Sequence, residues 1–140
     1  PPRSTPLYSS AASDVYKRQV LLICKNKIVL GSNVRVGFQV QFIDTSIHQL
    51  IDLSTLEKLP LNGTIHLDDY NWVGNRTTIM KNTQTPVNCI IASNSLINKD
   101  YTPFGENILI GGLPAKLLKE NISRDWEGER ENLERNLIIY

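Results

Sequence analysis

The sequence predicts an all-β solenoid with triangular coils, and two observations indicate this fold. The first is a bulky or β-branched residue at every sixth position, namely Leu67, Val73, Ile79, Thr85, Ile91 and Ile97. The second is a small or polar residue four places after each of the first five, namely Asn71, Thr77, Thr83, Cys89 and Ser95. Three short strands per coil, each turning one bulky and one small side chain to the axis, produce this pattern. Strands of a β-sandwich alternate with period two and would not keep a six-residue phase over two separate blocks.

The repeats fall in two blocks. The same register occurs earlier at Leu30, Val36 and Phe42, so residues 20–43 form the first predicted block and residues 65–100 the second. Residues 44–64 break the period, and a loop of this length in a compact domain is usually functional. Glycine and asparagine tolerate left-handed backbone, which we expect at the corners, and the chain has them near those places, at Gly31, Gly37, Gly74, Asn75, Asn82 and Asn88.

The two ends of the chain are expected to differ from the coils. Residues 1–19 resemble a translated sequencing-library adapter, so we expect them to be non-native and an N-terminal portion of the protein to be missing; the alternative is a natural disordered leader. Residues 20–116 are then the solenoid domain. In the tail, residues 117–140, a short helix can start at 117–121. Residues 127–136 fit an amphipathic helix that caps the open end of the solenoid, or else a frayed, solvated tail.

Composition excludes several classes of function. Without residues 1–19 the chain has twelve basic and thirteen acidic residues, a formal net charge of −1, so no basic surplus points to nucleic acid. No apolar run is long enough for a membrane span, and residues 20–24 are predicted to be a strand. The two cysteines, Cys24 and Cys89, suit small core positions, and two cysteines make no metal-site spacing. So few cysteines favour a protein of the reducing cytoplasm.

Three segments resemble motifs of one known family. Residues 65–75, I-H-L-D-D-Y-N-W-V-G-N, resemble the I-x-I-G-D-x-x-W-I-G-x segment of hexapeptide-repeat acyltransferases. That left-handed β-helix family contains galactoside, maltose and polysaccharide O-acetyltransferases. Residues 91–100 are similar to its I-G-A-G-S-V-V-T-K-D segment, and residues 112–116 match its closing G-x-P-A-K. Glycine is usual in the family where this chain has Asp68, Pro86 and Ala92. The resemblance implies a left-handed parallel β-helix with a short C-terminal helix.

The resemblance implies that His48 is the catalytic base. His48 follows the point where the first block ends and lies 24 residues before Trp72, similar to the family's catalytic histidine. A neutral imidazole can take the proton of a hydroxyl that attacks a thioester, and a positioned base contributes about a hundredfold to ten-thousandfold. The alternative is an ordinary surface histidine. His66 is expected to point outward from its strand, and Asp44 either orients His48 or the acceptor hydroxyl or caps a loop.

The same resemblance implies an acyl-CoA co-substrate, most often acetyl-CoA. Trp72 would contact its thioester and pantetheine, and Asn75 and Ser93 would hydrogen-bond that arm. Toward the phosphates would lie Asn98, Lys99 and Lys116. The alternatives are that the indole covers a coil face and that the lysines are solvated turn residues. Direct transfer without a covalent intermediate is expected, because no nucleophile–base arrangement is indicated.

The family's members usually assemble as trimers with the site between neighbouring solenoids, so we expect a homotrimer in which His48 and Trp72 need not share a chain. We expect a shortened chain to assemble poorly and to be a weak or inactive enzyme. The implied acceptor is a hydroxyl of a sugar or surface-polysaccharide precursor; alternatives are N-acetylation of an amino sugar and a non-catalytic trimeric scaffold. A zinc-dependent carbonic anhydrase of this fold would need three histidine ligands, and the chain contains two, so no metal is expected.

Overall fold

A computed structural model of the chain describes residues 19–135, and these residues wind through three sheets around one core. The expectations for residues 1–18 and 136–140 lie outside the described residues. Sheet A consists of the parallel strands β1 (Leu21–Ile23), β4 (Gln41–Ile43), β9 (Thr78–Met80) and β12 (Leu96–Ile97). Sheet B consists of the parallel strands β2 (Lys27–Leu30), β7 (Thr64–Leu67) and β10 (Thr83–Thr85). Sheet C consists of β3 (Arg35–Val36), β8 (Trp72–Val73), β11 (Cys89–Ile91), β13 (Ile108–Gly112) and β14 (Ala115–Glu120), of which β14 is antiparallel.

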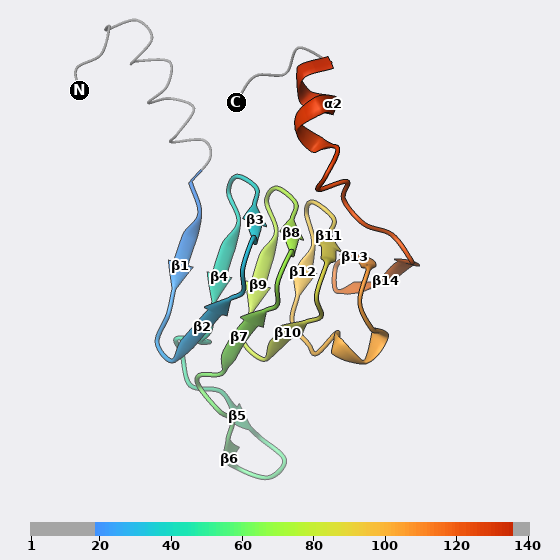
Figure 1. Cartoon of the computed structure of the whole chain (residues 1–140). Helices are drawn as coiled ribbons and strands as arrows, with labels where there is room; N and C mark the ends of the chain where they lie inside the picture. Colours follow the sequence, from blue (N-terminus) through green and yellow to red (C-terminus); the bar gives the residue numbers. More distant parts are fainter. Residues whose placement is uncertain (1–18, 136–140) are drawn as a thin grey trace, which may run out of the picture.

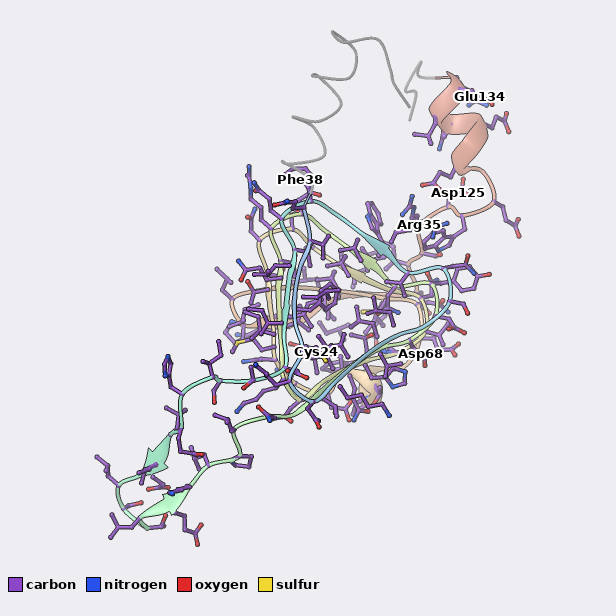
Figure 2. All side chains as sticks on the ribbon, turned by 90° about the vertical axis from the view of Figure 1, so that its left-hand side faces the viewer. Cys24, Arg35, Phe38, Asp68, Asp125 and Glu134 are labelled. Atoms are coloured by element: carbon purple, nitrogen blue, oxygen red, sulfur yellow. The ribbon has the colours of Figure 1, made fainter. Side chains whose placement is uncertain are left out.

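The chain visits the sheets in the constant order A, B, C, and each coil lies on the one before it (Figure 1). Partners on adjacent coils of the second block are 18 residues apart, as in Leu67 paired with Thr85, which is three repeats of six. Across the break the spacing becomes 37, as in Val36 paired with Val73, so the break inserts 19 residues into one coil. Viewed along the coils, the outline is triangular (Figure 2). The predicted parallel solenoid with three-sided coils is therefore present.

The core consists of the residues that the six-residue period selects. All six bulky positions and all five small positions of the second block are at most 2% exposed. Hydroxyls in the interior donate to strand carbonyls, as Thr83 Oγ1 does to Met80 O at 2.7 Å, so the polar members are satisfied. The first block is less covered: Leu30 is 40% exposed, although its partner Leu67 is fully buried, because β2 has a neighbouring strand on one side only.

The corners confirm part of the prediction about left-handed residues. Positive φ recurs every six residues in the second block, at Tyr70, Arg76, Asn82, Asn88 and Asn94. Gly37 and Gly74 lie at corners but do not have positive φ. They are needed for close approach, since a Cβ on Gly74 would lie 2.6 Å from the backbone nitrogen of Ser93. The prediction of left-handed backbone was therefore correct for Asn82 and Asn88 and wrong for Gly31, Gly37, Gly74 and Asn75.

The break in the period is a projecting arm, which we call the excursion (residues 44–64). It leaves after β4 and returns at β7, at the corner between sheets A and B, and points away from the coils (Figures 1 and 2). Its outer part is an antiparallel hairpin of β5 (Ile51–Asp52) and β6 (Glu57–Lys58). The arm exposes its aliphatic side chains to solvent, including Leu53 at 85% and Leu56 at 76%.

The C-terminal end of the coils is closed differently from the prediction. A 3-10 turn, η1 (Thr102–Phe104), follows Tyr101, which is fully buried and donates its hydroxyl to Ala115 O at 3.2 Å. Of the segment expected to start a helix at 117–121, residues 117–120 instead belong to β14, because the open edge of β13 pairs with them and Leu117 packs on the core. Tyr101 and the β13–β14 hairpin thus cover the end of the core.

A short helix is present near the C-terminus, but it does not cap the coils. This helix, α2 (Glu129–Arg135), falls within the predicted 127–136 segment. Figure 2 shows it beyond the triangular outline, with Asp125 and Glu134 both outside the triangle. Within residues 19–135, no helix has the length and hydrophobicity needed to cross a membrane.

Candidate functional site

His48 lies near the start of the excursion, beyond the corner between sheets A and B. Its imidazole is exposed to solvent. The preceding residue, Ile47, has φ of 62°, which is an outlier for a β-branched side chain. Thr45 Oγ1 holds this conformation by accepting from Ile47 N at 3.0 Å. Strained backbone of this kind occurs preferentially at functional sites, and here it turns the chain one residue before His48.

The neck of the excursion is tied together on both sides of His48. Ser46 N donates to Leu61 O at 2.9 Å, and Ser46 Oγ lies 3.1 Å from His48 O and 3.3 Å from Leu61 O. Gln49 Nε2 donates across the arm to Leu59 O at 2.6 Å. Ser46 and Gln49 therefore limit the positions that the His48 backbone can adopt. Neither residue is predicted from the sequence, because both contacts join residues on opposite sides of an irregular loop.

Asp44 is a turn-capping residue in this structure. It is fully buried, and its carboxylate oxygens accept from the backbone nitrogens of Lys25, Asn26 and Lys27, each at 2.7 Å. Burial alone would raise the pKa of Asp44, but these three hydrogen bonds and one from Cys24 keep that pKa below its ordinary value. Of the two roles considered from the sequence, the contacts favour the structural one.

Trp72 lies on the side of the triangle opposite the excursion. It belongs to β8 of sheet C, is 40% exposed, and pairs with Arg35 of β3. Figure 2 shows Arg35 on one side of the triangle and Cys24 near the corner from which the excursion departs. In a three-sided coil the corner between A and B faces sheet C across the core. One chain therefore does not bring His48 and Trp72 together.

The surface around Trp72 is completed by the segment 121–128, which we call the C-terminal strap. The Arg124 guanidinium carbon lies 4.8 Å from the ring centroid of Trp72 and 4.5 Å from that of Trp126. Trp126 Nε1 donates to Asn88 Oδ1 at 3.2 Å. Arg124 and Trp126 are not predicted from the sequence; the one available signal is that Trp126 is the second of only two tryptophans in the chain.

Asn75 and Ser93 stack on each other at the corner between sheets C and A. Asn75 N donates to Ser93 Oγ at 3.0 Å, and Asn75 Oδ1 accepts from Phe38 N at 3.1 Å, so both side chains join neighbouring coils. The residues that directly follow them, Arg76 and Asn94, border a shallow hollow of about 340 Å³ on the outside of sheet A. The other residues that line the hollow are Thr78, Ser95, Leu96 and Leu113.

The three residues expected near phosphates lie toward the C-terminal end of the coils, in two places. Asn98 and Lys99 are exposed after β12, at the corner between sheets A and B, with Lys99 Nζ 5.6 Å from the Tyr101 ring centroid. This is the corner of the excursion, two strand spacings or about 10 Å further along sheet A. Lys116 is exposed on β14 of sheet C, paired with Gly111. Lys99 and Lys116 thus belong to different sides of the triangle.

The cysteines and the acidic residues do not form a reactive or metal-binding group in the described part of the chain. Among residues 19–135, no three histidine, cysteine, aspartate or glutamate side chains are arranged to hold a metal ion. Cys24 and Cys89 are free thiols, and burial raises the pKa of Cys89 to about 12. Cys89 is therefore protonated and serves as one of the small core residues.

Comparison with known proteins identifies the family. No family model matches the chain. A "Probable macrolide acetyltransferase" of Lysinibacillus sphaericus is 31% identical over an alignment that covers 78% of this chain and 76% of that protein.

Three solved structures share the fold at lower identity. The polysialic acid O-acetyltransferase OatWY matches 86% of this chain with a TM-score of 0.68 and 22% identity, and the polySia-specific acetyltransferase NeuO matches 84% with 0.56 and 17%. The N-acyltransferase AntD from Bacillus cereus, solved with dTDP and coenzyme A, matches 79% with 0.55 and 14%. The chain spans 58–63% of the length of these three chains. With its hexapeptide period, its parallel coil strands in three sheets and this relative, the chain belongs to the hexapeptide-repeat acyltransferase family.

Proposed function

We propose that this chain transfers an acetyl group from acetyl-CoA to a hydroxyl, with His48 as the general base, in a site that two copies of the chain share. The observation that carries the proposal is the placement of His48 and Trp72 on opposite sides of one coil. A single chain offers the imidazole on one corner and the indole on the far sheet. A neighbouring copy can bring its Trp72 beside the first copy's His48 without any change within either coil.

The shared site is part of a homotrimer in this proposal. The excursion exposes six large aliphatic side chains, each between 43% and 85% exposed: Ile47, Leu50, Ile51, Leu53, Leu56 and Leu59. Exposed apolar residues gathered in one place are typical of a surface that contacts another protein. A neighbouring coil that covers the arm would bury them and fix His48 at the interface. The coils wind in the left-handed sense of the family, and three copies close the ring.

The chemistry requires one proton acceptor near the acceptor hydroxyl. The His48 imidazole accepts the hydroxyl proton as the oxygen attacks the thioester carbonyl. This attack forms the new ester C–O bond; the C–S bond then breaks, and coenzyme A leaves as a thiol with the proton that His48 returns. Transfer is direct, because the described residues show no nucleophile activated by a neighbouring base.

Acetyl-CoA would extend from Trp72 along the corner between sheets C and A. The 40% of Trp72 that remains exposed gives the pantetheine an apolar surface. Asn75 and Ser93 would contribute backbone groups, because their side chains already join the coils. The exposed side chains of Asn98, Lys99 and Lys116 would contact the phosphates of acetyl-CoA. Because Lys99 and Lys116 lie on different sides of the triangle, the two lysines at one site would come from different copies.

We propose a saccharide hydroxyl as the acceptor, such as that of a surface-polysaccharide precursor. The match to polysialic acid O-acetyltransferases supports a saccharide, and the 31% identity to the macrolide acetyltransferase supports a macrolide hydroxyl as a second candidate. N-acetylation of an amino sugar and a non-catalytic scaffold are the alternatives. The free thiols of Cys24 and Cys89 are consistent with an enzyme of the reducing cytoplasm.

The proposal is tested by replacing each of the two histidines in turn. His48→Ala should lower kcat by about two to four orders of magnitude with coenzyme A affinity unchanged, and His48→Asn should fail similarly, since an amide cannot take the proton. His66→Ala is the matched control: His66 is exposed on β7 and should not matter. Thiol release is followed with sugar, amino-sugar and macrolide acceptors. Near-parental turnover by His48→Ala on the best acceptor would remove His48 from the mechanism and favour the scaffold.

A further inference from the structure

We propose that the C-terminal strap positions Trp72 for acyl-CoA, with Arg124 as the positioning residue. This inference rests on the proposed function, because it concerns the same co-substrate. The strap lies outside the hexapeptide repeat and outside the segments that resemble the family's motifs. Its role has to come from its contacts.

Arg124 forms a cation–π cluster with both tryptophans, which we call the stack. Its guanidinium carbon lies 4.8 Å from the ring centroid of Trp72 and 4.5 Å from that of Trp126. A planar guanidinium can contact an aromatic ring on each of its faces, which an ammonium group cannot do. The Arg124 side chain is only 19% exposed and is paired with Glu129. One face of the Trp72 ring is therefore covered by a charge that the strap itself supplies.

Trp126, the second ring in the stack, is held at a fixed place on the coils. Trp126 donates through Nε1 to Asn88 Oδ1, and its ring meets the edge of Tyr70 with centroids 5.5 Å apart and planes at 72°. Asn88 also donates to Asn107 Oδ1 at 2.7 Å and to Ser123 Oγ at 2.8 Å, so all the polar groups of its amide are used. The strap is thus fastened at a coil corner.

This arrangement fixes one side of Trp72 and leaves part of the residue exposed. Trp72 remains 40% exposed, so the ring has surface for a ligand after Arg124 has covered one face. An indole that is already held in one orientation loses less rotational freedom when a ligand packs on it. Loss of the stack should therefore weaken binding of acyl-CoA, whereas the proton transfer that His48 of the neighbouring copy performs in the shared site should be unchanged.

The experiment compares three replacements of arginine in the whole chain. Arg124→Ala removes the stack, Arg124→Lys keeps the charge but not the plane, and Arg135→Ala is the matched control, because it removes an exposed arginine that pairs with Glu131 on α2. Acetyl-CoA affinity is measured by calorimetry, kcat and KM by thiol release, and the packing of the stack by acrylamide quenching of fluorescence. The chain has two tryptophans, and both contact Arg124, so the fluorescence reports on this cluster alone.

For Arg124→Ala we expect acetyl-CoA Kd and KM to rise about tenfold, kcat to stay within about twofold, and quenching to increase. Arg124→Lys should lie between Arg124→Ala and the parent, and Arg135→Ala should match the parent. If Arg124→Ala does not fold, Arg124→Lys and Trp126→Leu carry the same test. Parental Kd with increased quenching would overturn the positioning role and leave the proposed function intact. Absence of acetyl-CoA binding by the parent would instead overturn the proposed function and this inference with it.

Discussion

Replacing Asp44 should destabilise the coil corner from which the excursion departs, without changing recognition of the acceptor. The carboxylate is fully buried and accepts three backbone hydrogen bonds of 2.7 Å from residues 25–27. A hydrogen bond to a charged group contributes about 1.5–3 kcal/mol, and residues 25–27 are exposed, so water replaces part of the loss. We therefore expect Asp44→Ala to lower the free energy of unfolding by about 2–4 kcal/mol and Asp44→Asn by less. That is a large part of the about 5–15 kcal/mol available to a small domain.

The pH dependence provides the specific signature. Because the pKa of Asp44 is lower in the folded state than its ordinary value of 3.8, ionised Asp44 contributes stability above that value. The contribution is lost as the pH falls through the folded-state pKa. The difference in unfolding free energy between the parent and Asp44→Asn should thus be constant from neutral pH to about pH 5 and shrink below about pH 4.

Urea unfolding followed by tryptophan fluorescence, at several pH values, measures this difference. Asp52→Asn is the matched control: Asp52 accepts from Ser54 N at 2.8 Å in the exposed hairpin, so its replacement should change global stability far less. A loss below about 0.5 kcal/mol for Asp44→Ala, the range of ordinary surface substitutions, would refute the structural role. A raised acceptor KM with parental stability would restore the substrate-orienting role considered from the sequence.

Two further predictions concern the co-substrate and the assembly. Replacing both Lys99 and Lys116 with alanine should weaken acetyl-CoA binding and reduce the dependence of that binding on salt, with the melting temperature nearly unchanged. If calorimetry at two salt concentrations finds equal affinity in the variant and the parent, both lysines are solvated turn residues. If the proposed homotrimer forms, replacing Leu53 and Leu56 with serine should shift it toward monomers by removing apolar surface from the excursion. A parent chain that light scattering finds to be monomeric would contradict the shared site.

The repeat could be predicted from the sequence because it is a local signal that recurs. Leu67 and Asn71 occupy the two inward-facing positions of one repeat, and a bulky and a small buried residue recur at these positions in the later repeats. The corner conformations were harder to predict. Tyr70 and Arg76 adopt left-handed backbone, a conformation that asparagine adopts more readily. Hydrogen bonds to the previous coil hold them in it: Tyr70 N donates to Ser32 O at 2.8 Å, and Arg76 N donates to Phe38 O at 2.9 Å.

The strap and the end of the coils could not be predicted, because their contacts are long-range and occur once. Asn88 and Trp126 are 38 residues apart, and no spacing in the sequence indicates that they meet. The same holds for Tyr101, whose hydroxyl reaches Ala115, and for β14, whose own sequence suits a helix start as well as a strand. For β14 the deciding factor is the free edge of β13, a property of the folded coils and not of the segment itself.

A regular coil offers few side chains for catalysis, since each turn repeats the same three faces and its small inward residues pack in the core. The residues with a proposed function lie in segments that interrupt the six-residue period, or they contact such a segment. His48 is in the excursion, Lys99 begins the irregular segment before β13, and Arg124 of the strap covers Trp72. The repeat supplies rigidity and a fixed spacing along the sheets, and the interruptions supply the side chains. Two of these interruptions lie at the corner opposite the third. This separation is the reason for proposing a site built between copies and not within one.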